Sequence, residues 1–226
     1  MGEKPTKAEG DNLLPRDIMK QPQNMLQPPP TIRLPRPEEI PSYPEVIELL
    51  NARENANIVE GYTFSVNTTN DLPFKFYAEI NIDNSRLWSL FIALAHQLPD
   101  KVSCIYNLYE EEAIISGYKD KNLILAQLHR YETELAQDCF LEFGLIYHAQ
   151  NELGEVFVAD SKFLKVWGND EIAFRELMNE FGLKKIENLN FIDEFPKIVE
   201  PLNMFNGKVK NSETVVSELN EFFAVD

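Results

Sequence analysis

Alternating apolar and polar positions mark several short strands along the chain. The clearest run is residues 74–82, where every second residue is apolar, and residues 62–66 alternate in the same way. A period of two is typical of a strand with one face on the core and one in water. Because Asn70-Asp71 lies between the two runs, the pattern predicts a β-hairpin. Further strands are expected at residues 102–109, 113–118, 140–147, 155–159 and 163–167.

Apolar residues spaced three and four apart predict helices between and after these strands. The first has the spacing of a capping box, with Ser42 three residues before Glu45. The third has its apolar face at positions 124, 128, 131 and 135. The helices are expected from Ser42 to about 55, from Asp83 or Asn84 to Pro99, from Asp120 to beyond Leu135, from Asn169 or Asp170 to Gly182, and over residues 215–223.

This order of elements predicts an α+β fold. Most strands keep a polar face, which favours a mainly antiparallel sheet with helices packed on one side. Only residues 101–109 and 143–147 are apolar enough for the centre of the sheet, and residues 183–207 are expected to be irregular.

Proline divides the chain into two parts. Ten of the fourteen prolines fall within residues 1–44, and proline lacks the amide proton that helices and ladders need. We therefore predict a Pro-rich extended or disordered leader over residues 1–41 and a single acidic α+β domain over residues 42–226. The run 27–37 favours polyproline II, which suits a ligand for an aromatic groove, a tether, or a strip packed on the domain through Ile32 and Leu34. On this interpretation, removing residues 1–40 leaves the domain folded.

The charge of the chain is concentrated in the predicted domain. The net charge is −16, and residues 1–44 are neutral, so the whole excess lies in residues 45–226. Such a surface repels phosphate backbones and anionic lipid, which argues against nucleic-acid and membrane partners. It favours either a basic protein partner or solubility alone. With no apolar signal sequence, no membrane-length apolar run and only Cys104 and Cys139, the chain is expected in a reducing cytoplasm.

No motif of catalysis, metal binding or cofactor binding is present. The glycines form no phosphate loop, the cysteines have no CxxC partner, and the histidines fit no zinc pattern. His129 and Glu132 are close in sequence, but a solvated contact explains them better than a ligand pair. We predict no catalytic residue, no cofactor and no metal site. An enzyme site assembled only in three dimensions remains an alternative.

Aromatic residues beside carboxylates form the candidate partner-binding residues. Tyr and Trp supply contact area in interfaces, and acidic side chains steer a basic partner. Tyr77 occupies the polar side of its strand, so the periodic pattern does not place it in the predicted core. The ordinary alternatives are a solvated loop and tyrosines at strand edges. The candidates are Tyr109, Glu110, Glu111, Glu112 and Tyr118, followed by Asp193 and Glu194.

Two stretches give the chain a family resemblance. They are FLEFGLIYHAQNELGEVFVADSKFLKVWGNDEIAFRELMNEFGL and NLNFIDEFPKI. They resemble a strand–strand–helix segment and a following Asp-Glu-Phe-Pro run in immunity proteins of bacterial polymorphic-toxin and contact-inhibition systems. The resemblance covers about residues 60–200 and carries over no site residues. It implies a cytoplasmic protein that binds a toxin domain and blocks its active site. The alternative is a secretion or assembly chaperone, or a structural subunit, that uses the leader as a binding arm.

Overall fold

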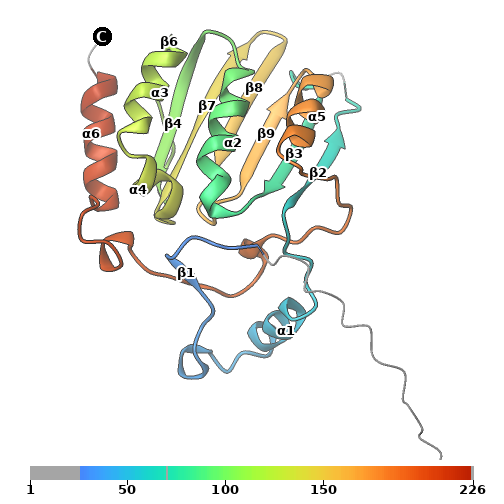
Figure 1. Cartoon of the computed structure of the whole chain (residues 1–226), viewed down its shortest axis with the longest axis vertical. Coiled ribbons are helices and arrows are strands. Elements are labelled where there is room, and N and C mark those ends of the chain that lie inside the picture. Colours follow the sequence, from blue (N-terminus) through green and yellow to red (C-terminus); the bar gives the residue numbers. More distant parts are fainter. Residues whose placement is uncertain (1–25, 70, 225–226) are drawn as a thin grey trace, which may run out of the picture.

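An antiparallel β-sheet forms the centre of the structure (Figure 1). The computed structural model describes residues 26–69 and 71–224. Neighbouring strands follow the order β2-β3-β9-β8-β7-β4-β5, with β6 paired to β4, and each of these ladders is antiparallel. The strands are β2 (Gly61–Val66), β3 (Phe76–Asn81), β4 (Lys101–Leu108), β5 (Ile114–Ile115), β6 (Lys119–Asp120), β7 (Leu141–Ala149), β8 (Glu152–Val158) and β9 (Leu164–Gly168).

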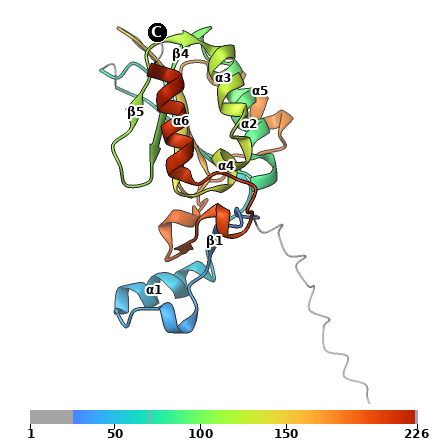
Figure 2. The same ribbon diagram turned by 90° about the vertical axis from the view of Figure 1, so that its left-hand side faces the viewer.

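Five helices cover one face of this sheet, as Figures 1 and 2 show. They are α2 (Asn84–His96), α3 (Lys121–His129), α4 (Glu132–Gln137), α5 (Glu171–Glu180) and α6 (Ser212–Ala224). Their apolar sides meet the alternating apolar positions of the strands in one core, where the Phe91 and Phe143 rings lie 4.8 Å apart. The α+β prediction, with helices on one face of an antiparallel sheet, is therefore confirmed.

Two of the predicted helix caps are present. The carboxylate of Asp120 accepts hydrogen bonds from the backbone of Asn122 and Leu123, and that of Asp170 accepts one from Ala173. These bonds satisfy donors that the first turn of a helix leaves unpaired. Asp83 also precedes its helix, but its side chain accepts from the backbone N–H of Gln27 instead, at 2.8 Å.

The continuous helix predicted from Asp120 to beyond Leu135 is wrong. Tyr131 leaves helical geometry, with φ −121° and ψ 23°, and separates α3 from α4. Its ring is still buried, and its hydroxyl donates to Glu218 at 2.5 Å. The apolar spacing therefore predicted which side chains enter the core, although tertiary contacts interrupt the helix between them.

The predicted place of residues 101–109 in the sheet centre is also wrong. Their strand, β4, has only the two-residue strands β5 and β6 beyond it. Helix α6 packs on one face of β4, and the chain after Tyr109 returns along its outer edge, where Ser116 and Cys104 exchange hydrogen bonds. These coverings explain why a strand near the edge of the sheet is so apolar.

Helix α1 (Pro44–Arg53) lies apart from the sheet in both views (Figures 1 and 2). None of its residues is buried, and Ile47 and Leu49 are 47% and 44% exposed. The predicted capping box is wrong as well. Tyr43, and not Ser42, precedes the first turn, and no side chain caps it. We refer to residues 34–57, which carry α1, as the arm.

Residues 26–41 of the predicted leader are attached to the domain. Strand β1 (Ile32–Arg33) pairs with β10 (Ile198–Val199), a ribbon that the sequence pattern did not predict. Ile32 packs with Cys139 and Ile192, whereas Leu34 is exposed. Three short 3-10 turns complete the fold, at Pro37–Glu39, Ile192–Glu194 and Leu202–Met204. Residues 1–25 lie outside the described residues, and the boundary at residues 41 and 42 stays a prediction.

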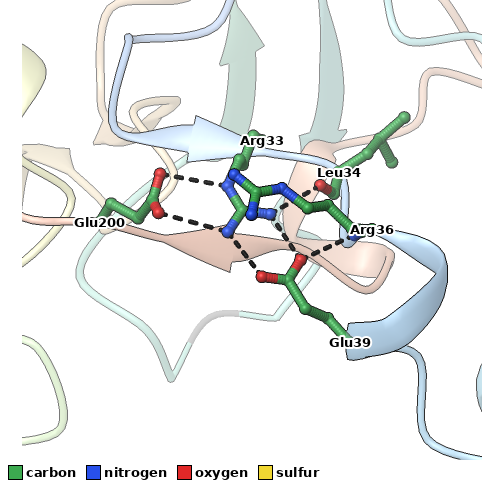
Figure 3. Close-up of polar contacts among 5 residues, drawn as sticks. All are labelled: Arg33, Leu34, Arg36, Glu39 and Glu200. Carbon is green, nitrogen blue, oxygen red and sulfur yellow. Dashed lines mark hydrogen bonds and ion pairs between the residues drawn. The ribbon is translucent and has the colours of Figure 1, made fainter.

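Arg33 holds the start of the arm to the C-terminal segment (Figure 3). Its guanidinium donates to both carboxylate oxygens of Glu200, at 3.1 and 3.2 Å, and to both of Glu39, at 2.7 and 2.8 Å. Paired, charge-assisted hydrogen bonds of this kind fix orientation as well as distance. The two carboxylates raise the pKa of Arg33, and Arg33 lowers the pKa of Glu39 to about 2.

Candidate protein-binding surface

The face of the sheet opposite the helices carries aromatic and acidic side chains. Tyr77 of β3 and Trp167 of β9 are ladder partners, and their rings lie 4.7 Å apart. Glu155 of β8 is the next partner in the same row. The Tyr77 hydroxyl donates to Glu79 at 2.7 Å. These side chains alternate with the core residues of their strands, so the pleat directs them away from the helices.

A second part of this surface is the turn that follows β4. Tyr109, Glu110, Glu111 and Glu112 are all exposed, and Glu110 has φ +68°. Left-handed geometry is uncommon for a residue other than glycine, and here it reverses the chain direction after the strand. The Asp160 carboxylate, then burial, and then the carboxylates of Glu110 and Glu142 raise the pKa of the Tyr109 hydroxyl. The turn therefore lies within the field of carboxylates from other elements.

Asp193 interacts electrostatically with residues associated with both parts. It belongs to the turn Ile192–Glu194, and it interacts electrostatically with Asp160 and with Lys165 of β9. Desolvation is the main cause of the raised pKa of Asp193, and Lys197 opposes it. Asp193 and Glu155 also contribute to the raised pKa of Tyr77, after desolvation and Glu79. Asp193 therefore interacts electrostatically with Tyr77, and Asp160 interacts with both Asp193 and Tyr109.

We call the residues joined by these interactions the acidic–aromatic surface. It contains six carboxylates and three aromatic rings, with Lys165 and Lys197 among them. Its defining residues are Tyr77, Glu79, Tyr109, Glu110, Glu142, Glu155, Asp160, Trp167 and Asp193. It includes candidates that the sequence offered separately, Tyr109 with Glu110 and Asp193, and it adds members that were not predicted.

Two predicted candidates have other positions. Tyr118 precedes β6, which pairs with the first residues of β4, whereas Tyr109 follows the last. Eight residues of strand put them about 25 Å apart. Tyr118 also binds the backbone of His148, accepting from its N–H at 2.8 Å and donating to its carbonyl at 2.9 Å. Glu194 closes its own turn, because it accepts from the Phe191 N–H at 2.6 Å and from Asn190.

The sequence pattern gave only weak evidence for the residues of this surface that were not predicted. Glu155 and Trp167 occupy the polar positions of their strands, next to the buried Val156 and Val166. That alternation predicts their face of the sheet. It does not predict that their strands are neighbours, or that Asp193 returns to the same face from a segment expected to be irregular.

Burial changes the proton affinity of several titratable groups. Burial raises the pKa of Glu155 to about 7, so this carboxyl exchanges a proton near neutrality. Burial also raises the pKa of Cys139 to about 11 and that of Cys104 still further, which keeps both as thiols. Within residues 26–69 and 71–224, no group of three or more His, Cys, Asp or Glu could hold a metal ion. His129 and Glu132 form an exposed contact at 3.0 Å.

Comparisons with family models, curated proteins and solved structures found no match to this chain. No helix of the described residues combines the length and apolar character that a membrane span requires.

The raised pKa of Glu155 predicts a pH-dependent stability. The folded chain holds this proton more tightly than the unfolded chain, so stability falls as pH rises from about 4.5 through about 7. Glu155→Gln removes the buried charge. Its thermal midpoint should match the parent at pH 4 and exceed it by about 3–8 °C at pH 8, since one pKa unit is about 1.4 kcal/mol and partial exposure reduces the effect. Scanning calorimetry at both pH values measures this difference.

Glu176→Gln is the matched control for this experiment, because Glu176 is exposed on α5. Its midpoint should follow the parent at both pH values. Equal midpoints for Glu155→Gln and the parent at pH 8 would contradict the buried charge.

Proposed function

We propose that this chain is a non-catalytic, acidic protein-binding domain, and specifically an immunity protein that binds and neutralises a toxin domain. The observation that carries the proposal is the acidic–aromatic surface, which combines six carboxylates and three rings from the polar side of the strands and from the turns after β4 and β8 and at Ile192–Glu194. The family resemblance of residues 140–183 and 188–198 supports the immunity role.

The surface suits a basic protein partner. Clustered carboxylates raise the local concentration of a cationic partner and accelerate its association. Rings such as Tyr77 and Trp167 provide rigid area that becomes buried on binding and slows dissociation. A basic cleft is what an enzyme acting on nucleic acid presents, so a domain that covers it with carboxylates blocks access to the phosphate backbone. The activity proposed here requires no cofactor, no metal and no catalytic residue.

The arm favours a second candidate function. Tyr43, Ile47 and Leu49 are exposed on or next to a helix that contributes no buried residue. A helix of this kind can dock into a groove on another protein, as a chaperone or a subunit of a larger bacterial assembly requires. Immunity remains the first proposal, because the acidic–aromatic surface combines six carboxylates with three rings and agrees with the family resemblance.

Affinity purification from the native host distinguishes the two functions. A tagged chain is compared with its Glu110→Lys/Glu111→Lys/Glu112→Lys variant, and the proteins that co-purify are identified by mass spectrometry. Immunity predicts one basic toxin domain that the variant captures poorly and that the parent inhibits at a one-to-one ratio. Capture of secretion or sheath components by both chains, with no enzyme inhibited, would contradict immunity and support the subunit role.

A further inference from the structure

Two aromatic rings and a carboxylate form one row on the face of the sheet opposite the helices. Tyr77 of β3, Trp167 of β9 and Glu155 of β8 are successive ladder partners. The two ring centres are 4.7 Å apart, and the ring planes are inclined at 41°. Partners on neighbouring strands have Cα atoms about 4.5–5.5 Å apart, so Glu155 is the immediate neighbour of Trp167. All three residues are half-buried, which leaves the row partly accessible to a ligand.

The Glu155 carboxylate has no partner for its charge. It makes no hydrogen bond or ion pair with any described residue, and desolvation raises its pKa with no cation to oppose the change. Lys165 lies two residues before Trp167 on the same face of β9, but its ammonium lies 5.2 Å from the centre of the Phe163 ring. A partly buried charge without a counterion loses hydration and gains nothing in exchange. This carboxylate is therefore available to a cation from another molecule.

The ring pair is held in position before any ligand arrives. The Tyr77 hydroxyl donates a hydrogen bond to Glu79 at 2.7 Å, which fixes the Tyr77 ring beside Trp167. A site whose side chains are already ordered loses less entropy on binding than a flexible one. The negative faces of the rings and the carboxylates of Glu79 and Glu155 also select the sign of the ligand, because they attract a cation and repel an anion.

The arrangement favours an arginine over a lysine. A guanidinium is flat, so it can stack on an aromatic ring and at the same time donate two parallel hydrogen bonds to one carboxylate. The ammonium of lysine is compact and strongly hydrated, and it cannot do both. A ring next to an unpaired carboxylate, as Trp167 is next to Glu155, therefore matches a guanidinium.

We propose that Tyr77, Trp167 and Glu155 form a binding site for an arginine side chain of a basic protein partner. The guanidinium stacks on the aromatic pair and donates to the Glu155 carboxylate. The site rests on the proposed function for the source of the arginine, and it identifies the residues of the acidic–aromatic surface that anchor that partner.

An NMR titration of the full-length chain with N-acetyl-arginine amide tests the site without any partner protein. At pH 8, where Glu155 is ionised, the indole N–H resonance of Trp167 should shift with a dissociation constant on the order of 1–10 mM. The resonance of Trp88, which belongs to α2 and packs against the core, should not move. N-acetyl-citrulline amide has the shape of the arginine probe without its charge and should not bind. N-acetyl-lysine amide should bind at least about threefold more weakly.

A matched pair of variants assigns the charge contact to Glu155. Glu155→Gln should weaken arginine binding about tenfold, because the hydrogen bonds to a charged acceptor are lost. Glu176→Gln, on the exposed side of α5, should bind like the parent. An unmoved Trp167 resonance, equal binding of the arginine and citrulline probes, or equal affinities of the two variants would overturn the site. Equal binding of the arginine and lysine probes would overturn the choice of arginine.

This titration and the capture of a partner fail separately. Arginine binding by a chain that captures no basic protein would support the site and contradict the proposed immunity function. Capture and inhibition of a basic toxin domain by a chain that binds no arginine probe would support that function and overturn the site.

Discussion

A chain lacking residues 1–40 should unfold at least about 8 °C below a chain lacking only residues 1–25. Both shortened chains lose the segment outside the described residues, and they differ only in residues 26–40. Those residues include the buried Thr31 and Ile32. The Thr31 hydroxyl donates a hydrogen bond to the Gln137 carbonyl at 2.5 Å. The backbone carbonyl of Thr31 accepts one from the Glu200 N–H at 2.9 Å. Losing a buried Ile costs about 2–5 kcal/mol, and each kcal/mol moves the midpoint by about 2–4 °C at this chain length.

Single substitutions provide the matched control for this truncation. Ile32 is 6% exposed, whereas Leu34, two residues on in the same segment, is 51% exposed. Ile32→Ala should lower the midpoint by most of the truncation effect, and Leu34→Ala should change it by no more than about 2 °C. Calorimetry on the two variants and the two truncations measures this. Equal midpoints for the two shortened chains would mean that residues 26–40 contribute nothing to folding.

Reversing Glu110, Glu111 and Glu112 to lysine should slow association with the captured partner at least about tenfold. Glu110 belongs to the acidic–aromatic surface, and Glu111 and Glu112 follow it in the same exposed turn, so the three carboxylates should steer a basic partner together. The matched control reverses Glu176, Glu180 and Glu221, which are exposed on α5 and α6. Each triple variant changes the net charge from −16 to −10, because every reversal adds two positive charges. The control should slow association far less.

Association kinetics between about 50 and 500 mM salt complete this test. The parent rate should fall steeply with salt, since charges farther apart than about 8 Å are screened at physiological ionic strength. Tyr109→Ala should accelerate dissociation, and Tyr118→Ala, at the other end of β4, should not. Association rates that do not change with salt concentration would mean that the acidic residues serve solubility alone. Equal association rates for the two triple variants, with unchanged circular dichroism spectra, would mean the same.

The positions of helices and strands could be predicted from the sequence where burial follows a regular period. Residues 74–82 and 62–66 alternate because one face of each strand meets α5 and its neighbours, and the predicted hairpin is the β2–β3 pair. The caps at Asp120 and Asp170 could be predicted because each carboxylate accepts hydrogen bonds from backbone N–H groups of the same turn. In contrast, Ser42 and Glu45 have the correct spacing but do not cap α1.

Only part of the candidate site could be predicted from the sequence, because only some of its residues are clustered along the chain. Tyr109 and the following glutamates, and Asp193, stand out locally as acidic or aromatic clusters in the printed sequence. Their separation in sequence hides the Asp160 carboxylate that connects them in space. Tyr118 is the opposite case, because it is near Tyr109 in sequence and about 25 Å away along β4.

By itself, the sequence determined the fold class, most strands and helices, the composition of the core and the location of the excess negative charge. These features depend on period, propensity and composition, which are properties of neighbouring residues. Only the tertiary structure decided the order of the strands, the pairing of β1 with β10, the isolation of α1 and the union of Tyr77, Asp193 and Tyr109 on one surface. Each of those features depends on contacts between residues that are distant in the sequence. Such contacts are determined by the packing of the whole domain, and they produce no periodic pattern in the sequence.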